Sequence, residues 1–311
     1  MRVEEGIGHF LFHCQYEKDL SDKTLRAYSG DLKQFRLFLS QHETSDFVQD
    51  VDKSVIRAFL KALHKRYGPR SIKRKVASLK AFLNYLEYED KITANPFRKM
   101  RLTLDKAKPL PKTLSIESVE AILRTAYAER NSLRRETVAW KEAVRNSAVI
   151  ELLFATGMRV GELCSLEFRH VDLGTGSLLV QGKGRKERRI PICQGAALDA
   201  LRYYREAFAG MLDPAGAFFV NRYGRAITDQ SVRLMVAHMA RNAGVSEHVT
   251  PHMFRHTLAT LLLENGVDIR FIQFLLGHSS ISVTEIYARV NEKAQREVLE
   301  KRHPRGEIMD N

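Results

Sequence analysis

The chain has 311 residues, of which 44% are hydrophobic, so it is long enough for two domains that each bury a core. Its formal net charge of +13 at pH 7 and its pI near 9.7 favour a polyanionic partner, either nucleic acid or an anionic membrane surface. Charge alone leaves open a basic soluble protein without such a partner.

Membrane and disulfide-rich classes are excluded by pattern. No apolar run approaches the roughly 18 residues that span a bilayer, and no signal-peptide pattern stands at the N-terminus, so we expect a cytoplasmic protein. Three widely spaced cysteines, Cys14, Cys164 and Cys193, favour free thiols in a reducing compartment. His9 and His13 lie close to Cys14, but a fourth ligand is absent, which favours helix packing over a zinc site.

The first hundred or so residues predict consecutive short helices. Apolar residues recur at spacings of three and four in three segments, 21–41, 52–68 and 71–90. We expect Ser21 to cap the first helix, Gly68 to end the second and Ser71 to cap the third. The sequence "NPF" at 95–97 then breaks the helical pattern.

Basic side chains gather in the segment 64–80, which contains no acidic residue. They flank a predicted helix N-terminus, where backbone N–H groups also attract phosphate, so we expect this segment to contact DNA. The residues predicted to make that contact are Arg70, Lys73, Arg74 and Lys75. The alternative is a solvated charged face.

A polar, basic segment broken by Pro109 and Pro111 predicts a linker, and a second helical region follows it. Helices are predicted at about 115–130, 139–156, 228–243, 250–265, 268–276 and 282–300. Between them, "SLLVQ" and "ERRIPI" flank the turn "GKGRK", which is typical of a β-hairpin. The chain is therefore expected to be mainly α with a small β element.

Separate pieces of this second region hold residues suited to an anionic centre: Arg159, Lys183, His252, Arg255, His278 and Tyr287. Singly, each has an ordinary structural explanation. Arg159 with Glu162 one turn on is usually a surface ion pair. Thr250 as cap and Pro251 at the first helical position would place His252 and Arg255 on exposed first turns, facing the same way.

Together these residues predict phosphoryl transfer. Two guanidiniums can hold both non-bridging oxygens of a phosphodiester, and two imidazoles can bind the same oxygens or move the nucleophile's proton. A lysine can protonate a departing alkoxide, and a tyrosine can attack phosphorus. The sequence has no carboxylate cluster of the DxD type, no P-loop and no H-E-x-x-H, so a reaction without a metal is favoured.

The ordered set resembles the tyrosine recombinase (phage integrase) family, and its short Xer-type members in particular. The stretches "ATGMRVGELCSL", "GKGRKERRIPI", "PHMFRHTLATLLLENG" and "IQFLLGHSSISVTEIY" match that family's boxes. The resemblance assigns Arg159, Arg255, His252 and His278 to the scissile phosphate, Lys183 to general acid catalysis and Tyr287 to nucleophilic attack. Two departures are a longer segment at 126–146 and Gly161 where many members carry serine.

The resemblance also implies a fold and an assembly. It implies a helical, SAM-like core-binding domain at 1–103, a linker at 104–114 and an α-rich catalytic domain with a small β-hairpin at 115–311. Four protomers, identical or paired with a sister recombinase, would act on two double-stranded DNA sites through 3′-phosphotyrosine links and a Holliday junction. Neither a metal nor ATP would serve as cofactor. The tail "KRHPR" resembles the segment that Xer-type proteins pass to a neighbouring protomer.

The setting that the resemblance implies is the prokaryotic cytoplasm, in association with the nucleoid and with no membrane contact. The function would be DNA integration and excision, or resolution of chromosome dimers. Two alternatives stay open: an enzyme of the type IB topoisomerase kind that relaxes DNA as a monomer, and a catalytically silent DNA-binding regulator with the same fold. The short helical N-terminal region and the tail weigh against the first. An intact Tyr287 with both arginines weighs against the second.

Overall fold

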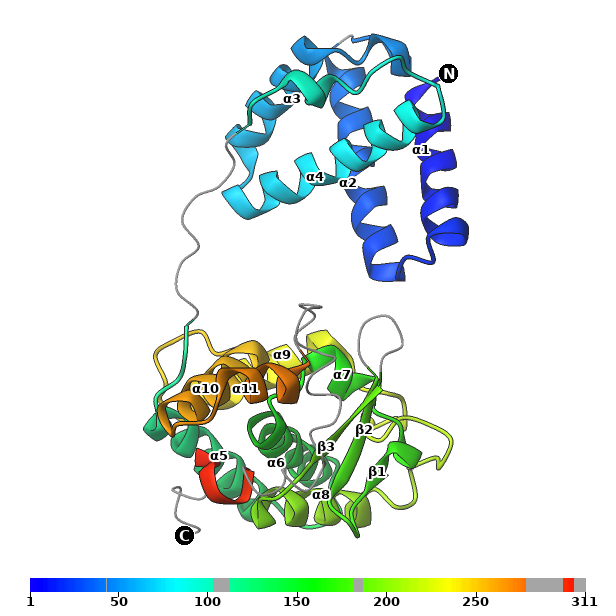
Figure 1. The fold of residues 1–311 in the computed structure, drawn as a ribbon. Coiled ribbons are helices and arrows are strands. Elements are labelled where there is room, and N and C mark those ends of the chain that lie inside the picture. The colour runs from blue at the N-terminus through cyan, green and yellow to red at the C-terminus, as the bar shows by residue number, and fades with distance from the viewer. Residues whose placement is uncertain (43, 103–111, 182–186, 278–298, 305–311) are drawn as a thin grey trace. The chain divides into compact units, whose positions relative to one another are not determined.

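The computed structural model describes residues 1–42, 44–102, 112–181, 187–277 and 299–304 (Figure 1). The chain is mainly helical, as predicted, with one three-stranded antiparallel sheet in the described part. It divides into two compact units, Met1–Pro109 and Leu110–Asn311. None of the helices in the described residues is long and apolar enough to cross a membrane.

The N-terminal unit is a cluster of helices around one apolar core. Its elements are α1 (Val3–Phe12), η1 (His13–Glu17), α2 (Asp22–Gln41), η2 (Val48–Asp50), α3 (Lys53–Arg66), α4 (Pro69–Tyr88) and η3 (Pro96–Lys99). Helix α2 packs against α4, and α1 contacts both (Figure 1). Leu32 and Phe35 from α2, Ile56 from α3, and Phe82 and Leu83 from α4 are fully buried in this core. Burial of these apolar side chains is the main force holding the unit together.

The predicted helix ends are partly confirmed. Ser21 caps α2, because its side-chain oxygen accepts a hydrogen bond from the backbone N–H of Thr24. Helix α3 ends at Arg66 with Tyr67 as its C-cap, so it stops just before Gly68 as predicted. Gly68 itself is the N-cap of α4, which begins at Pro69, and the prediction that Ser71 caps this helix is wrong. Proline suits the first helical position because its φ is already helical and its missing N–H needs no partner there.

The C-terminal unit is built around one buried helix. Its helices are α5 (Ile116–Ser132), α6 (Val138–Thr156), α7 (Val160–Cys164), η4 (Phe168–His170), α8 (Gly195–Ala207), α9 (Asp229–Asn242), α10 (Pro251–Glu264) and α11 (Ile269–Leu276). Helix α6 contacts α5, α8 and α10 and lies at the centre of the unit (Figure 1). The stretch from Ala148 to Thr156 is almost wholly excluded from solvent, which makes the end of α6 a rigid support.

The predicted hairpin is present. Strands β1 (Val171–Asp172), β2 (Ser177–Gln181) and β3 (Glu187–Pro191) pair antiparallel in the order β1-β2-β3. Side chains alternate along β3: Arg188 and Ile190 turn toward the interior, and Arg189 between them is exposed. The hairpin tip, residues 182–186, lies outside the described residues.

The segment 299–304 packs against its own unit. Leu299 is fully buried, and its carbonyl accepts a hydrogen bond from the side-chain amide of Gln194 at 3.2 Å. His303 is buried against Phe154, and its Nε2 donates to the carbonyl oxygen of Ala155 at 3.2 Å. The start of the tail therefore rests on the last turn of α6. Most of the helix predicted at 282–300 lies outside the described residues.

Candidate active site

The site begins at the sharp end of α6. Gly157 ends that helix with φ of +59°, in the left-handed region that favours glycine. A Cβ on Gly157 would lie 2.7 Å from Leu276 on α11 and 3.0 Å from Leu258 on α10. Only glycine at position 157 therefore lets α10 and α11 pack this closely against the turn between α6 and α7. This turn places Arg159 at the N-cap position of α7.

Arg159 is fixed by contacts at both of its ends. Its backbone N–H donates to Glu162 Oε2 and its Nη1 donates to Glu162 Oε1, both at 2.8 Å. Its Nη2 donates to the carbonyl oxygen of Gly277 at 2.9 Å. The Arg159 side chain stays 41% exposed, whereas that of Glu162 is only 7% exposed. The alternative explanation, an ordinary surface ion pair, does not describe this contact: the Glu162 carboxylate is buried, and only the guanidinium of Arg159 reaches solvent.

Arg188 on β3 is the second partner of the same carboxylate, and it was not among the predicted site residues. Its Nη1 and Nη2 donate to the two oxygens of Glu162 at 3.0 Å and 2.9 Å. Glu162 thus accepts four hydrogen bonds. Burial opposes its ionisation most strongly, but the bonds and charge of Arg188, together with the bonds from Arg159, hold its pKa below the usual range. The one available sequence signal is strand alternation, which turns Arg188 to the same face as Ile190.

Arg255 lies inside the unit and not on an exposed turn, so that part of the prediction is wrong. Only 3% of its surface is exposed. Its Nη1 donates to the carbonyl oxygen of Gly157 at 2.8 Å, and its Nη2 to that of Leu276 at 2.6 Å. Desolvation, together with the charge of Arg159, lowers the pKa of Arg255 to about 10, and Glu162 acts against this. The guanidinium remains charged at neutral pH.

The end of α11 lies against both arginines. Arg255 donates to the carbonyl of Leu276, and Arg159 donates to that of Gly277. Gly277 is the C-cap of α11 and has a left-handed conformation with φ of +64°. These carbonyls lie at the negative end of the helix dipole, so two cations suit them. His278 follows Gly277 in the chain but lies outside the described residues, as do Lys183 and Tyr287.

The two histidines of α10 form a pair. The rings of His252 and His256 meet edge to face with centroids 4.4 Å apart. Desolvation lowers the pKa of His252, and the charges of His256 and Arg255 add to this effect. The pKa of His256 is lowered by desolvation and by Arg255. Both imidazoles are therefore neutral at pH 7, and a neutral ring offers one donor and one acceptor.

The structure places the predicted DNA contacts of the N-terminal unit at different depths. Arg70, Lys73 and Arg74 are exposed on the first turns of α4. Lys75 is only 5% exposed, and its Nζ donates to Asp31 on α2 at 3.0 Å. Lys75 therefore does not present its ammonium to solvent, which corrects the prediction for this residue.

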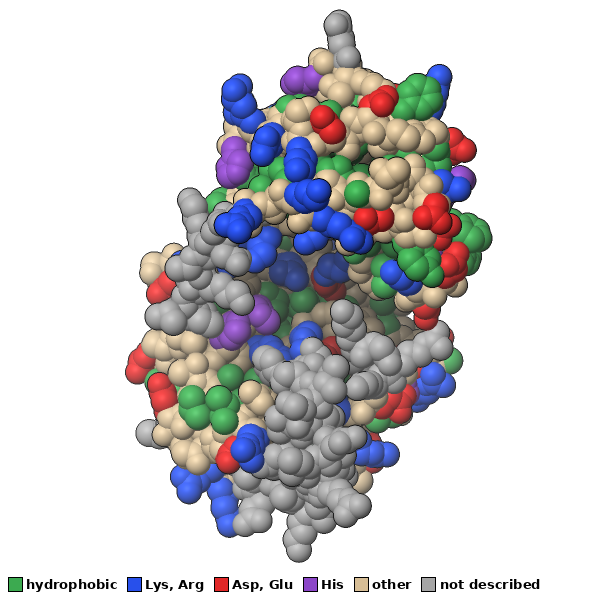
Figure 2. Space-filling view, turned by 45° about the horizontal axis from the view of Figure 1, so that its top comes forward, with side chains coloured by type: hydrophobic (Ala, Val, Ile, Leu, Met, Phe, Trp, Pro, Cys, Tyr) green, Lys and Arg blue, Asp and Glu red, His purple; other side chains and the backbone are tan. Residues whose placement is uncertain are grey.

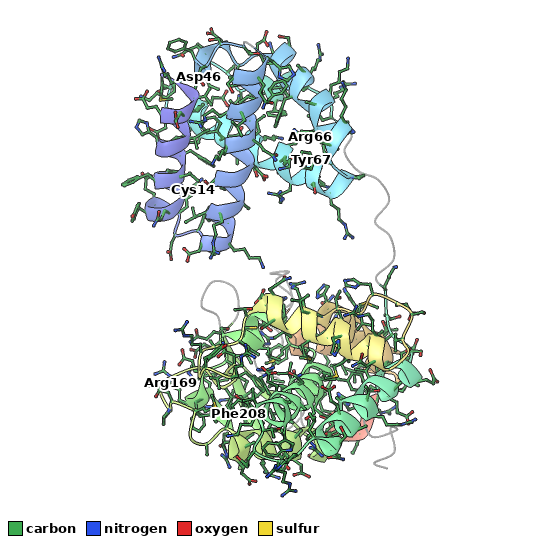
Figure 3. All side chains as sticks on the ribbon, turned by 180° about the vertical axis from the view of Figure 1, so that it is seen from behind. Cys14, Asp46, Arg66, Tyr67, Arg169 and Phe208 are labelled. Carbon is green, nitrogen blue, oxygen red and sulfur yellow. The ribbon has the colours of Figure 1, made fainter. Side chains whose placement is uncertain are left out.

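Asp31 ties α2 to α4. Asp31 is 3% exposed, and its carboxylate also accepts bonds from Arg74 and, at 2.8 Å, from the hydroxyl of Ser78. The ammonium of Lys75 lies over the ring of Tyr67, 4.7 Å from its centroid. Figure 3 labels Tyr67 beside Arg66, where α3 gives way to α4. On the face that Figure 2 displays, Lys and Arg side chains form a band across this unit.

Among the described residues, no group of three or more His, Cys, Asp or Glu side chains could hold a metal ion. The described polar groups of the site are instead cations, imidazoles and one saturated carboxylate. Such a set can bind a negatively charged oxygen group through charge-assisted hydrogen bonds. It can also stabilise further negative charge that develops on that group.

Comparison with known proteins agrees with this chemistry. The family described as "Phage integrase family" matches residues 114–294, and "Phage integrase, N-terminal SAM-like domain" matches residues 7–90. A tyrosine recombinase of Agathobacter rectalis is 40% identical over 307 residues, covering 98% of both chains. The tyrosine recombinase XerD of Lacticaseibacillus casei is 35% identical over 302 residues, covering 96% of this chain and 99% of its own.

A solved structure shares the fold. It is a lambda integrase tetramer bound to a Holliday junction, with a TM-score of 0.68 at 20% identity, covering 91% of this chain and 79% of that one. The predicted family and fold class are thus confirmed. The chain belongs to the phage integrase family, the tyrosine recombinases, and it is a site-specific recombinase that cleaves and rejoins DNA.

Proposed function

We propose that Arg159, Arg255 and His252, together with His278, bind the scissile phosphate of a specific recombination site in double-stranded DNA. In the same proposal, Lys183 acts as general acid and Tyr287 as nucleophile. The observation that carries the proposal is an imbalance of charge. Arg159 and Arg188 both act on the buried charge of Arg255, and the carboxylate that opposes them there is that of Glu162, which already accepts bonds from Arg159 and Arg188.

This imbalance favours an anion. Arg255 is almost fully buried, and its charge is further opposed by Arg159 and Arg188. Crowded, partly buried cations are costly unless an opposite charge joins them. A phosphodiester beside the exposed part of Arg159 would relieve that repulsion and would gain hydrogen bonds that Glu162 does not use. The same donors would then stabilise the charge of the five-coordinate transition state.

The proposed reaction conserves the number of phosphoester bonds. The Tyr287 oxygen attacks phosphorus and loses its proton, while the bond from phosphorus to the 5′ oxygen breaks and that oxygen takes a proton from Lys183. The product is a 3′-phosphotyrosine and a free 5′ hydroxyl. A 5′ hydroxyl from the other DNA site reverses the step and exchanges the strand through a Holliday junction. Because the phosphotyrosine keeps the bond energy, the reaction needs neither ATP nor a metal.

Neutral imidazoles fit two roles in this step. His252 could donate a hydrogen bond to a non-bridging oxygen or accept the tyrosine proton directly. Its lowered pKa keeps the ring unprotonated and thus able to accept a proton at neutral pH. His256 is half-buried against it and supports the ring from the next turn of α10.

The exposed basic side chains of α4, Arg70, Lys73 and Arg74, are proposed to grip the DNA backbone. We assign residues 1–103 to the core-binding domain, 104–114 to the linker and 115–311 to the catalytic domain. The proposed assembly is four protomers on two DNA sites, either identical or shared with a sister recombinase. The lambda integrase tetramer supports the number of protomers. We place the protein in the prokaryotic cytoplasm, at the nucleoid.

A covalent-adduct assay on nicked recombination-site DNA tests the proposal. The unaltered protein should give a denaturant-resistant protein–DNA adduct, and Tyr287→Phe should bind the same DNA without forming one. An adduct from Tyr287→Phe would show that another residue is the nucleophile. No adduct from the unaltered protein on any bound site would leave a catalytically silent DNA-binding regulator.

A further inference from the structure

Arg188 lies where three parts of the proposed site meet. It stands on β3 as the second residue after the hairpin tip at 182–186, and it is paired with Val180 on β2. Its guanidinium donates to both oxygens of Glu162, on α7. On another side it lies directly against Gly277, the residue that closes α11: a Cβ built there would be 2.9 Å from Arg188 Nη1.

We propose that Arg188 is a positioning residue for DNA cleavage. It shares the carboxylate of Glu162, so that Glu162 does not fully neutralise Arg159, and it keeps Arg159 oriented toward the scissile phosphate. The inference rests on the function proposed above. It adds a residue to which the family resemblance assigned no role. The residue acts through Arg159 and through the end of α11, with no contact to the reacting atoms required.

How much of the positive charge of Arg159 is neutralised depends on how Glu162 is shared. Each oxygen of Glu162 accepts one bond from Arg159 and one from Arg188. Sharing the carboxylate leaves the pair of arginines with a net positive charge. Without Arg188, Glu162 would be balanced by Arg159 alone, and its two vacated lone-pair positions would compete with phosphate for the donors of Arg159.

Arg188 also helps to fix the geometry of the site. Arg159 reaches the carbonyl of Gly277 with Nη2 while Arg188 lies against the same glycine. Arg159 therefore binds the end of α11, and Arg188 fills the space beside it. The Arg188 side chain is 15% exposed, and its Nε is buried without a hydrogen-bond partner among the described residues. Arg188 thus uses its two Nη groups to bind Glu162 and leaves no room for a side chain at position 277, which links it both to Arg159 and to the end of α11.

The experiment compares two substrates. One carries the ordinary phosphodiester at the scissile position, and the other carries a methylphosphonate there, in which a neutral methyl group replaces one charged oxygen. Cleavage of the second substrate no longer needs a cation to balance that charge. A residue that acts through Arg159 should therefore matter much less on the methylphosphonate, whereas a residue that only supports the fold should matter equally on both.

The variants are Arg188→Met, Arg188→Lys and the matched control Arg189→Met. Arg189 is the next residue on the same strand, carries the same charge and is exposed on the opposite face. Arg188→Met should cleave the phosphodiester roughly 10²-fold more slowly with unchanged DNA binding, because small displacements of a phosphate ligand have effects of that order. On the methylphosphonate its deficit should fall to within about threefold, because that substrate no longer depends on the charge. The cleavage rate of Arg188→Lys should lie between those of Arg188→Met and the unaltered protein, and the rate of Arg189→Met should match that of the unaltered protein.

Each other outcome overturns the inference. Equal slowing of Arg188→Met on both substrates would make it a fold residue, and cleavage as fast as that of Arg189→Met would leave it no role. Should Arg188→Met fail to fold, the ratio of the two rates for Arg188→Lys decides in the same way. The adduct of the unaltered protein is measured first: if it is missing, the proposed function fails, and if it forms, only the role of Arg188 is at stake.

Discussion

Arg255 and Leu276 are joined by a short hydrogen bond: Nη2 of the arginine donates to the leucine carbonyl at 2.6 Å. The bond links the buried first turns of α10 to the last turn of α11, 21 residues further along the chain. The next carbonyl, that of Gly277, is taken by Arg159. The two arginines proposed to bind phosphate thus also hold the helix end from which the chain continues to His278. The proposed phosphate ligands and the end of α11 therefore depend on the same two side chains.

Gly277→Ala should lower both stability and cleavage. Alanine would have to adopt the left-handed backbone conformation of Gly277, which costs roughly 1–2 kcal/mol of stability, and its methyl group would also press on Arg188. Gly266→Ala is the matched control, because its φ is +76° and nothing lies within 4 Å of the added Cβ. Urea unfolding should show that the left-handed conformation lowers the free energy of unfolding of both variants, but only Gly277→Ala should cleave DNA more slowly than the unaltered protein. Equal cleavage by the two variants would contradict the crowding at Arg188.

The grip of α4 on DNA predicts a steep decrease of affinity with salt. Log K should fall linearly with log[salt], and replacing Arg70 and Lys73 by alanine should reduce the slope by roughly 0.9 for each phosphate that is no longer neutralised. Lys91 and Lys99 provide a control with an equal change of charge, since both are exposed in the same unit beyond the end of α4. If both double variants change the slope equally, the effect is one of net charge, and the segment is a solvated face.

Asp31→Ala should strongly destabilise the N-terminal unit, because it leaves the ammonium of Lys75 buried without its carboxylate. Breaking such a buried pair costs on the order of 3–5 kcal/mol. Adding Lys75→Met removes the orphaned charge and should recover part of the stability, which chemical denaturation of the single and double variants can measure. Additive destabilisation in the double variant would show that the pair does not interact.

Lys183 can be separated from the other cations by a substrate with sulfur at the 5′ bridging position. An alkoxide leaves poorly without a proton, so Lys183→Ala should slow cleavage of ordinary DNA by about 10²–10⁴-fold. The sulfur leaves without protonation, and Lys183→Ala should cleave that substrate almost as fast as the unaltered protein does. Arg255→Ala should stay slow on both. If sulfur does not rescue Lys183→Ala, the general acid lies elsewhere, and His252 is the next candidate.

His252 should titrate below 6.5, its ordinary value, because burial and neighbouring cations lower its pKa. A lowered histidine pKa adds stability that is present above the unfolded-state value and is lost as pH falls below it. NMR titration of the ring should show the low midpoint in the free protein and a higher one with bound DNA, since a phosphate favours the protonated ring. A midpoint that does not move on binding would place His252 away from the phosphate.

The sequence by itself determined most of the helices and the set of reactive residue types. The capping of α2 by Ser21, the left-handed end of α11 at Gly277 and the hairpin between β2 and β3 all follow from local patterns. Such patterns succeed because caps, turns and strand alternation depend on residues only a few positions apart. The family boxes are likewise short, contiguous stretches.

Only the tertiary structure decided which charges are buried and what they bind. Glu162 and Arg188 stand 26 residues apart, and Asp31 and Lys75 stand 44 apart, yet each pair shares a buried carboxylate. Residue type alone predicts a surface pair for Glu162 and a DNA contact for Lys75. A charge is drawn into the interior only when partners from other elements compensate for its lost hydration, and those partners are assembled by the packing of helices and strands.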